Sequence, residues 1–380
     1  MAQAYTPGLK VTDKMVLHKS RTLPLKGEVL VKEGDMVKAE DIVAKTDLPG
    51  GIHIINVMNI LGCEAKEVPE YMLKNEGDKI TEGEIIAETK PLLPFLKFMA
   101  AKVKSPIDGS IERVSSVTGQ VLLREPPQPV TIKAYVDGNI SKIIPQEGVV
   151  VEVVCSFIQG IFGIGGETNG ELFIAVSNPS DELKPDAITA AHAGKIVVCG
   201  RYVDIEVFKK ARTVGVRGLI AGGFGDKDLK ELLGYDLGVA ITGHEHVGLS
   251  LVVTEGFGRI AMAHKTFSLL KEREGLRTSI SGATQIRAGV IRPEIIIPLD
   301  AKTAAATVKQ EAESAPGGVK EGDPVRIIRE PNFGRLAKVK RLIPELTVVE
   351  SETKVRVMEV EFDDGTSFIV PRANIEIIED

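Results

Sequence analysis

Hydrophobic and polar positions alternate over short runs through the first 150 residues, a pattern typical of β-strands with one exposed face. The runs are rich in Val and Ile and are broken by Asp-Gly and Pro-Pro. The pattern Asp-Gly-x-Ile occurs twice, at residues 108–111 and 137–140. Because Asp-Gly between such runs favours tight hairpins, we expect two similar small sheets folded against each other.

An internal repeat lies within this β-rich region. Residues 33–46, EGDMVKAEDIVAKT, align without gaps with residues 76–89, EGDKITEGEIIAET. Glu, Gly, Asp, Ile, Ala and Thr recur at the same offsets, which indicates one supersecondary unit used twice. In each copy the Gly allows a positive φ at the turn, and the Asp beside it can bond its own backbone.

The hydrophobic period changes from Gly194 onwards. We expect strands at residues 195–200, 216–224, 238–243 and 249–257. Amphipathic helices are expected at residues 204–215, 226–234 and 261–275, with Asp204 as the N-cap of the first. Strands that alternate with short helices predict an α/β domain with a mostly parallel sheet, and residues 277–299 return to a β pattern.

Residues 301–322 are small, charged and free of aromatic residues, as in a linker. Residues 323–380 hold five short apolar runs separated by turns, which predict an SH3-like β-barrel. We therefore expect a multidomain α+β protein. Its predicted parts are a β-rich domain at 1–150, a mostly parallel α/β domain at 151–300, the linker at 301–322 and the barrel at 323–380.

Composition narrows the functional classes. The 380 residues carry a formal net charge of −6, so the chain as a whole is a poor electrostatic match for nucleic acid. Cys63, Cys155 and Cys199 stand far apart, without a Cys-x-x-Cys pair or a Cys/His cluster. We expect no disulfide framework, no metal centre and no cofactor. No signal-peptide core or membrane-spanning run is evident in the sequence, so we expect a cytoplasmic protein without a membrane partner.

The repeat, together with Ser-Pro-Ile-Asp-Gly-Ser-Ile at residues 105–111, resembles the barrel-sandwich hybrid fold. That fold occurs in biotinyl and lipoyl carrier domains and in the N-terminal part of one protein family of Rnf-type electron-transport complexes. The resemblance covers roughly the first 150 residues and implies a fold more than a function. Carrier domains place a modifiable lysine in a tight hairpin, and neither Lys45 nor Lys90 has that setting. We expect a structural sandwich here.

Residues 321–342, EGDPVRIIREPNFGRLAKVKRL, resemble the KOW motif of ribosomal and transcription-elongation proteins. Ala337 stands where that motif usually has a second Gly. The resemblance implies a surface that contacts RNA or protein. The hairpin is basic in an acidic chain, and its candidate contact residues are Arg326, Arg329, Arg335, Lys338, Lys340 and Arg341. The alternative is a solvated strand face balanced by Glu345, Glu350 and Glu352.

A glycine-rich loop at residues 160–170 follows an apolar strand. Backbone N–H groups in such a loop can hold phosphate, and Gly163, Gly165 and Gly166 are the candidates. The spacing is neither Gly-x-Gly-x-x-Gly nor Walker, and a strand rather than a helix is expected next. Close backbone packing or a lid is the preferred interpretation.

Polar segments at residues 222–226, 243–246 and 254–256 follow expected strands, and ligands favour the carboxyl ends of strands in open α/β sheets. His244, Glu245 and His246 offer imidazoles and a carboxylate for acid–base or metal chemistry. Metal binding would need a third ligand, and the expected topology alone makes Asp226, Glu255 and His264 the candidates. The alternative is that His244 caps a turn and His246 is exposed.

Three functional hypotheses remain open. The first is a non-enzymatic binding or assembly protein that acts through its β modules, with a protein partner or self-association. The second is an RNA-, ribosome- or transcription-associated factor that uses the C-terminal barrel. The third is an enzyme or ligand sensor with a site at residues 160–170 and 243–246. No complete catalytic constellation is present in the sequence, so the first is preferred.

Overall fold

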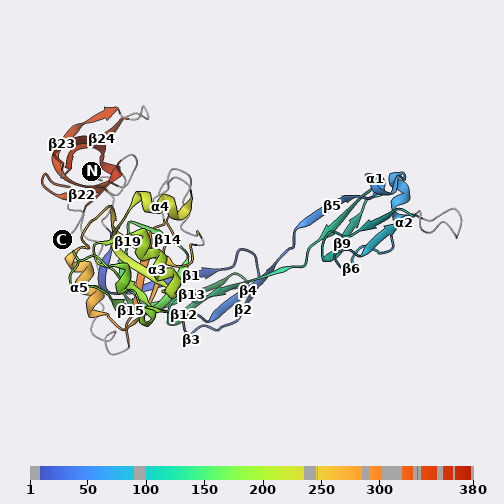
Figure 1. The fold of residues 1–380 in the computed structure, drawn as a ribbon, viewed down its shortest axis with the longest axis horizontal. Coiled ribbons are helices and arrows are strands. Elements are labelled where there is room, and N and C mark those ends of the chain that lie inside the picture. The colour runs from blue at the N-terminus through green and yellow to red at the C-terminus, as the bar shows by residue number, and fades with distance from the viewer. Residues whose placement is uncertain are drawn as a thin grey trace.

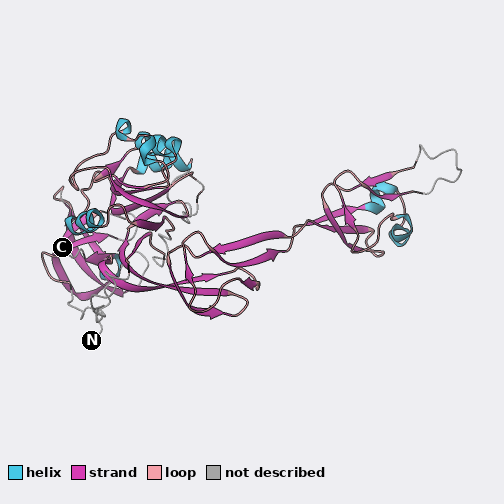
Figure 2. Ribbon diagram, turned by 90° about the horizontal axis from the view of Figure 1, so that it is seen from below, coloured by secondary structure: helices cyan, strands magenta, loops and turns pink. Residues whose placement is uncertain are grey.

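The chain folds into several β-rich parts, shown in a computed structural model (Figure 1). A body built on a large sheet carries a long β extension, the arm, on one side and a small β structure, the C-terminal barrel, on another (Figures 1 and 2). The structure describes residues 9–89, 100–234, 245, 247–284, 291–300, 319–327, 332, 335–348, 354–362 and 364–377.

The body is organised around a mixed sheet of 12 strands. Its main path is β14 (Phe162–Ile164), β19 (Ser250–Phe257), β18 (Gly218–Phe224), β16 (Ile196–Val198), β15 (Glu167–Ile174), β20 (Arg277–Ser281), β21 (Glu294–Pro298), β13 (Gly148–Gln159), β12 (Gly138–Ile144) and β3 (Met36–Val37). Off this path, β1 (Val11–Thr22) pairs with β13 and β17 (Tyr202–Val203) with β18. Parallel pairing is confined to β15, β16, β17, β18 and β19, and the other pairs are antiparallel.

The three helices predicted after residue 194 are all present. In α3 (Ile205–Val214), the Asp204 side chain accepts a hydrogen bond from the backbone N–H of Val207, and Gly215 adopts the left-handed conformation that ends the helix. The others are α4 (Asp226–Leu233), which ends at Gly234, and α5 (His264–Glu272). The strand predicted at residues 238–243 lies outside the described residues.

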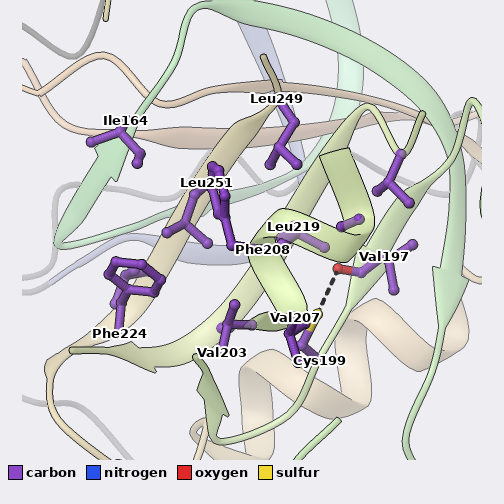
Figure 3. Close-up of a cluster of buried hydrophobic side chains, with 14 of the residues drawn as sticks. Ile164, Val197, Cys199, Val203, Val207, Phe208, Leu219, Phe224, Leu249 and Leu251 are labelled. Atoms are coloured by element: carbon purple, nitrogen blue, oxygen red, sulfur yellow. Dashed lines mark hydrogen bonds between the residues drawn. The ribbon is translucent and has the colours of Figure 1, made fainter. Parts of the chain in front are cut away.

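The parallel strands are buried on both faces. Along β18, Leu219 and Ala221 pack with α3 and α4, whereas Ile220 faces the opposite way and packs with α5. Figure 3 shows the first of these cores, where Phe208 of α3 lies among Leu219 and Leu251. Two short 3-10 helices, η3 (Pro185–Ala187) and η4 (Ala190–His192), lie between β15 and β16. A helical layer on each face explains why these strands read as continuous apolar runs.

The arm contains two modules. The base module, next to the body, is formed by residues 28–48 and 128–144. Its strands β3 and β12 are the end of the 12-stranded sheet, and its other sheet consists of β11 (Gln128–Lys133), β4 (Ile42–Leu48) and β2 (Glu28–Val29). The outer module, residues 52–124, has a sheet of β5 (Ile52–Asn56), β10 (Gln120–Arg124), β9 (Gly109–Val114) and β6 (Lys79–Ile80). It also holds α1 (Val57–Leu61), η1 (Ala65–Glu67), α2 (Val68–Tyr71), β7 (Ile85–Glu88) and β8 (Lys102–Lys104). Figures 1 and 2 both show the outer module set apart from the body by a narrow ribbon.

The two sequence repeats are nested in the arm, with one in each module. In the base, Gly34 N–H donates to the carbonyl of Ile140 at 2.8 Å; in the outer module, Gly77 N–H donates to the carbonyl of Ile111 at 2.7 Å. Each repeat therefore pairs with its own Asp-Gly-x-Ile segment. The expectation that the two small sheets fold against each other is wrong, because the ribbon separates them.

The part called the C-terminal barrel has five strands, as the sequence predicts, and they form one antiparallel sheet in the order β25, β24, β23, β22, β26. They are β22 (Pro324–Ile327), β23 (Leu336–Val348), β24 (Lys354–Phe362), β25 (Ser367–Pro371) and, after η5 (Arg372–Asn374), β26 (Ile375–Ile377). Val325, Val339 and Val360 are among the residues that form its own core. Residues 301–318 of the predicted linker lie outside the described residues.

Within the described residues, no helix has the length and apolar character that crossing a bilayer requires.

Candidate functional site

The glycine-rich loop is a place where backbones approach closely. Gly163 lies inside β14, and a Cβ atom there would stand 2.8 Å from backbone atoms of Gly282 and of Leu251. The Thr284 hydroxyl accepts a hydrogen bond from Gly163 N–H at 2.9 Å and contacts its carbonyl oxygen at 3.1 Å. These contacts use the backbone groups of Gly163 inside the protein. They support close packing as the role of this glycine.

The rest of the loop lies beside the segment that leads into β19. A Cβ atom on Gly165 would stand 2.7 Å from the carbonyl oxygen of Leu249, and the Ser250 hydroxyl donates to the carbonyl of Gly166 at 2.6 Å. Glu245 comes a few residues earlier, and its carbonyl accepts from the N–H of Val247. The loop therefore lies next to the amino end of β19. His244 and His246 lie outside the described residues.

The other candidate ligand residues lie toward the opposite end of the parallel strands. Asp226 is the first residue of α4, directly after the carboxyl end of β18. Residues 254–256 lie inside β19 and do not form the loop expected from the sequence. Gly163, Gly165 and Gly166 are thus not gathered with Asp226 and Glu255 at one place. His264 begins α5, and no group of three metal-ligating side chains occurs in the part of the chain that the structure describes.

Glu255 is instead engaged by the C-terminal barrel. Arg326 of β22 donates to its Oε2 at 2.8 Å, and the N–H of Ala263 donates to its Oε1 at 3.0 Å. The side chain of Arg326 is only 3% exposed, and that of Glu255 is 9% exposed. Arg326 is therefore not part of an exposed basic face, contrary to the expectation for the hairpin.

Three other basic residues of the hairpin lie near acidic partners. Arg335 pairs with Asp364 at 2.9 Å, and its guanidinium lies 3.7 Å from the centre of the Phe362 ring. Lys340 pairs with Glu361 at 3.1 Å, and Arg341 pairs with Glu359 at 3.5 Å. Lys338 is exposed. Arg329 lies outside the described residues. The acidic strand β24 thus offsets much of the charge that the sequence suggests, and RNA binding stays a prediction.

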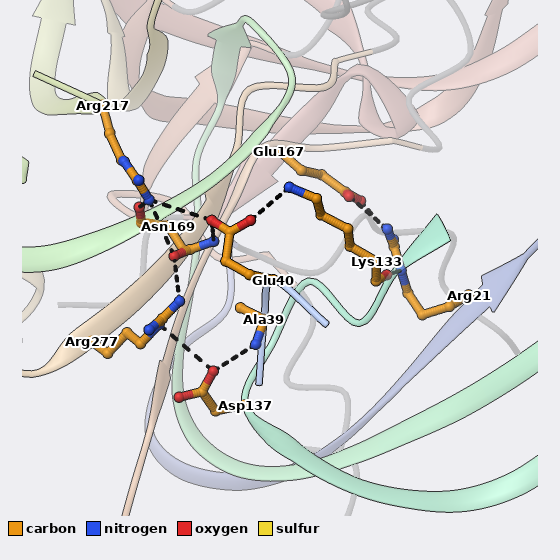
Figure 4. Close-up of polar contacts among 9 residues, drawn as sticks. All are labelled: Arg21, Ala39, Glu40, Lys133, Asp137, Glu167, Asn169, Arg217 and Arg277. Carbon is orange, nitrogen blue, oxygen red and sulfur yellow. Dashed lines mark hydrogen bonds and ion pairs between the residues drawn. The ribbon is translucent and has the colours of Figure 1, made fainter. Parts of the chain in front are cut away.

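A polar network that the sequence did not reveal joins the base module to the body (Figure 4). The Glu40 carboxylate accepts from Lys133 Nζ at 2.6 Å and from the side-chain amide of Asn169 at 3.0 Å. Arg277 donates to Asn169 Oδ1 at 2.8 Å, and Arg217 donates to its backbone carbonyl at 2.8 Å. Lys133 and Asn169 lower the pKa of Glu40 below its ordinary value. In the sequence, this network is indicated only by a difference between the two repeats: Glu40 of the first repeat aligns with Gly83 of the second.

A cleft of about 570 Å³ opens beside this network. Its lining includes Glu40, Asn169, Glu171, Arg217 and Arg277. Each of these charged side chains already has a partner in the protein, because Glu171 binds Lys195 at 2.9 Å and the others belong to the network. Glu40 is the lining residue that comes from the arm, and its contacts with Asn169 and Arg217 link the arm to the body.

A second set of contacts strengthens the same junction. Arg21 of β1 makes two hydrogen bonds of 2.7 Å with the carboxylate of Glu167. The guanidinium of Arg21 also lies 5.3 Å from the centre of the Tyr135 ring. The Ser279 hydroxyl donates to the carbonyl of Tyr135 at 2.6 Å. The bidentate pair with Glu167 fixes the orientation of the Arg21 guanidinium, whose Nε donates to the carbonyl of Lys133 in the base module at 2.8 Å. Arg21, Tyr135 and Ser279 thus add contacts between the base of the arm and the body.

An edge of the outer module also exposes apolar side chains. Strand β5 is the outermost strand of its sheet and pairs only with β10 among the described strands. Ile52 and Ile54 of β5 are 51% and 62% exposed. Cross-strand pairing puts Ile54 beside Leu122 on one face of the sheet. An unpaired edge with exposed apolar side chains is a template for another chain.

No protein-family model and no curated protein matches this chain.

Proposed function

We propose that this protein is a non-enzymatic binding or assembly protein that acts through the surfaces of its β modules. The observation that carries the proposal is strand β5, an edge strand of the outer module with exposed apolar side chains. The charged groups nearer the body contact one another, whereas β5 faces solvent. The outer module then provides the surface that binds a partner, and the body supports the arm that carries it.

The composition of β5 supports this assignment. Natural proteins usually protect an edge strand with Lys, Pro, a bulge or a covering segment. Strand β5 has the sequence IHIIN, and its pairing with β10 shows no irregularity of register. His53 pairs with Glu125 at 2.7 Å, so β5 has no series of unpaired charged side chains that would repel an incoming strand. An edge without these protections is suited to contact another strand.

The junction of the arm with the body supports the same proposal. The contacts of Glu40, Arg21 and Tyr135 hold the base module in one orientation on the body. The base module therefore fixes the point from which the ribbon extends to the outer module. The resemblance of the arm to barrel-sandwich hybrids, and of the C-terminal barrel to SH3-like modules, agrees with a role in contacts.

Site-specific photocrosslinking in cells tests the proposal. A photoreactive amino acid replaces Ile54 in the full chain, and the control replaces Val117, which is 87% exposed on the same module but outside β5. We expect crosslinked protein adducts from position 54 and few from position 117. Equal yields at both positions, or none at position 54, would contradict a binding role for this edge.

A further inference from the structure

The geometry points to a specific occupant of the exposed edge, and we propose that β5 pairs with β5 of a second copy of this chain. The two strands run antiparallel about a two-fold axis at Ile54 and continue the sheet of one outer module into the other. This inference rests on the proposed function, because it names the partner of the same surface.

The register follows from the hydrogen bonds that β5 already makes. Glu125 N–H donates to the carbonyl of Gly51 at 2.9 Å, which places Gly51 at a bonded position of the antiparallel pair with β10. Bonded and non-bonded pairs alternate along such a ladder. The backbone groups of Ile52 and Ile54 therefore point away from β10, toward the open edge. Asn56 ends the strand as the N-cap of α1, so its carbonyl serves the helix.

These outward groups match themselves under a two-fold rotation. With the axis at Ile54, the N–H and carbonyl of Ile54 meet the same groups of the second copy. Ile52 then lies opposite Asn56 of the second copy, and Asn56 opposite its Ile52. An isologous contact of this kind uses the outward N–H and carbonyl of Ile54 in both copies and closes on itself, so it yields a dimer and not a fibre.

The side chains agree with the same register. Ile54 would face its own copy on the surface that also carries Leu122, so an apolar stripe would run across the axis. β5 brings no Lys, Arg, Asp or Glu to this contact. Like charges directly opposite each other destabilise a sheet, and none arise here. A charged peptide would gain no ion pair from the strand itself, which favours a second copy as the occupant.

The placement of the outer module leaves room for this pairing. The ribbon separates the module from the body in both views of the molecule (Figures 1 and 2). A single five-residue strand pair buries less than the roughly 1,000 Å² expected of a stable interface. We therefore expect a weak dimer, with a dissociation constant on the order of 10 μM.

Sedimentation velocity on the full chain, from about 1 to 300 μM, tests the inference across that dissociation constant. The wild-type chain should shift from monomer to dimer over this range. Ile54→Lys sets two like charges across the axis and should raise the dissociation constant at least about 10-fold. Val117→Lys, an equally polar change on an exposed residue of the same module, should leave dimerisation unchanged.

A charge-swap mixture identifies the axis. Ile54→Lys and Ile54→Glu should each dimerise at least about 10-fold more weakly than the wild type, and their 1:1 mixture should form a heterodimer more readily than either variant alone. Hydrogen exchange gives a second readout, since the β5 amides should become protected with rising concentration in the wild type alone. A wild-type chain that stays monomeric at the highest concentration overturns the inference, as does a mixture that stays monomeric. If position 54 still crosslinks to a different protein, the proposed function stands and only the second copy is rejected.

Discussion

Arg326 of the C-terminal barrel donates to Glu255 in β19 of the body, and this ion pair is buried within the protein. The residues lie 71 positions apart in the chain. Both carboxylate oxygens of Glu255 are used, because Ala263 N–H donates to the other one. This ion pair links two parts of the molecule that have separate hydrophobic cores.

Removal of the arginine should be costly. Arg326→Met leaves the Glu255 carboxylate buried without its counter-charge, and such losses cost about 3–5 kcal/mol. We expect a fall of that size in the free energy of unfolding, measured with urea. The double variant Glu255→Gln, Arg326→Met should lose less than Arg326→Met alone, because no buried charge remains. Lys338→Met, on an exposed residue of the neighbouring strand, should change stability by no more than about 0.5 kcal/mol.

The glycine-rich loop should respond to substitution through packing. Gly163→Ala places a methyl group 2.8 Å from backbone atoms of Gly282 and Leu251, and overpacking of this kind costs about 1–3 kcal/mol. Gly166→Ala is the matched control, because no atom lies within 4 Å of the added methyl position. Thermal unfolding of both variants should show a lower midpoint for Gly163→Ala alone. Equal midpoints would mean that packing does not explain the loop.

The junction at Glu40 should weaken in acid. Hydrogen bonds from Lys133 and Asn169 lower the pKa of Glu40 below its ordinary value of 4.5. Because the folded pKa is the lower one, this carboxylate stabilises the folded state above pH 4.5, and the contribution is lost as pH falls through the folded pKa. The side chain is 43% exposed, so the effect should be below about 1 kcal/mol.

Glu40→Gln tests that assignment. The variant should be less stable than the wild type at pH 7, and the difference should vanish well below pH 4.5. Urea unfolding at several pH values measures it. Lys45→Gln is the control, since Lys45 pairs with Glu28 on the exposed surface of the same module at 3.1 Å. A difference for Glu40→Gln that persists unchanged in acid would contradict the role of its charge.

The thiols should differ in reactivity. Burial raises the pKa of Cys155 to about 12 and raises the pKa of Cys199 well above its ordinary value, and both side chains are buried. Cys63 in the outer module is only partly buried, and its pKa is raised by burial and by nearby Glu67. We expect a disulfide reagent at pH 8 to label one thiol slowly in the native protein and three after denaturation. Cys63→Ser should abolish the native reaction; rapid labelling of that variant would contradict the burial of the others.

Local signals in the sequence were sufficient for the helices of the body. Asp204 and Gly215 bracket α3 with side-chain and backbone contacts that span only a few residues, so the sequence carries both ends. The antiparallel strands around the parallel block were not predicted as one sheet with it. Their pairing joins distant segments, such as β13 with β21, and apolar runs alone do not specify a partner.

The nested arm and the candidate surfaces depend on contacts across long separations. Similarity between the repeats shows that a unit is used twice, but it does not tell which Asp-Gly segment pairs with Gly34 and which with Gly77. The basic hairpin likewise hides the difference between Arg326, which is buried, and Lys338, which is exposed. Charge along a sequence does not distinguish a surface residue from one that meets a partner 71 positions away.

The nesting of the repeats has a consequence for how the chain becomes native. The outer module joins Gly77 to Ile111, a short loop, whereas the base must bring Gly34 to Ile140. Closing a longer loop costs more entropy, and a completed outer module shortens the free chain between the two halves of the base. We expect folding to run from the tip of the arm inward, so that pulse-labelled hydrogen exchange finds β9 and β10 protected before β12. The outer module, which is the part most distant from the body, would then fold first and bring together the two chain segments that form the base module.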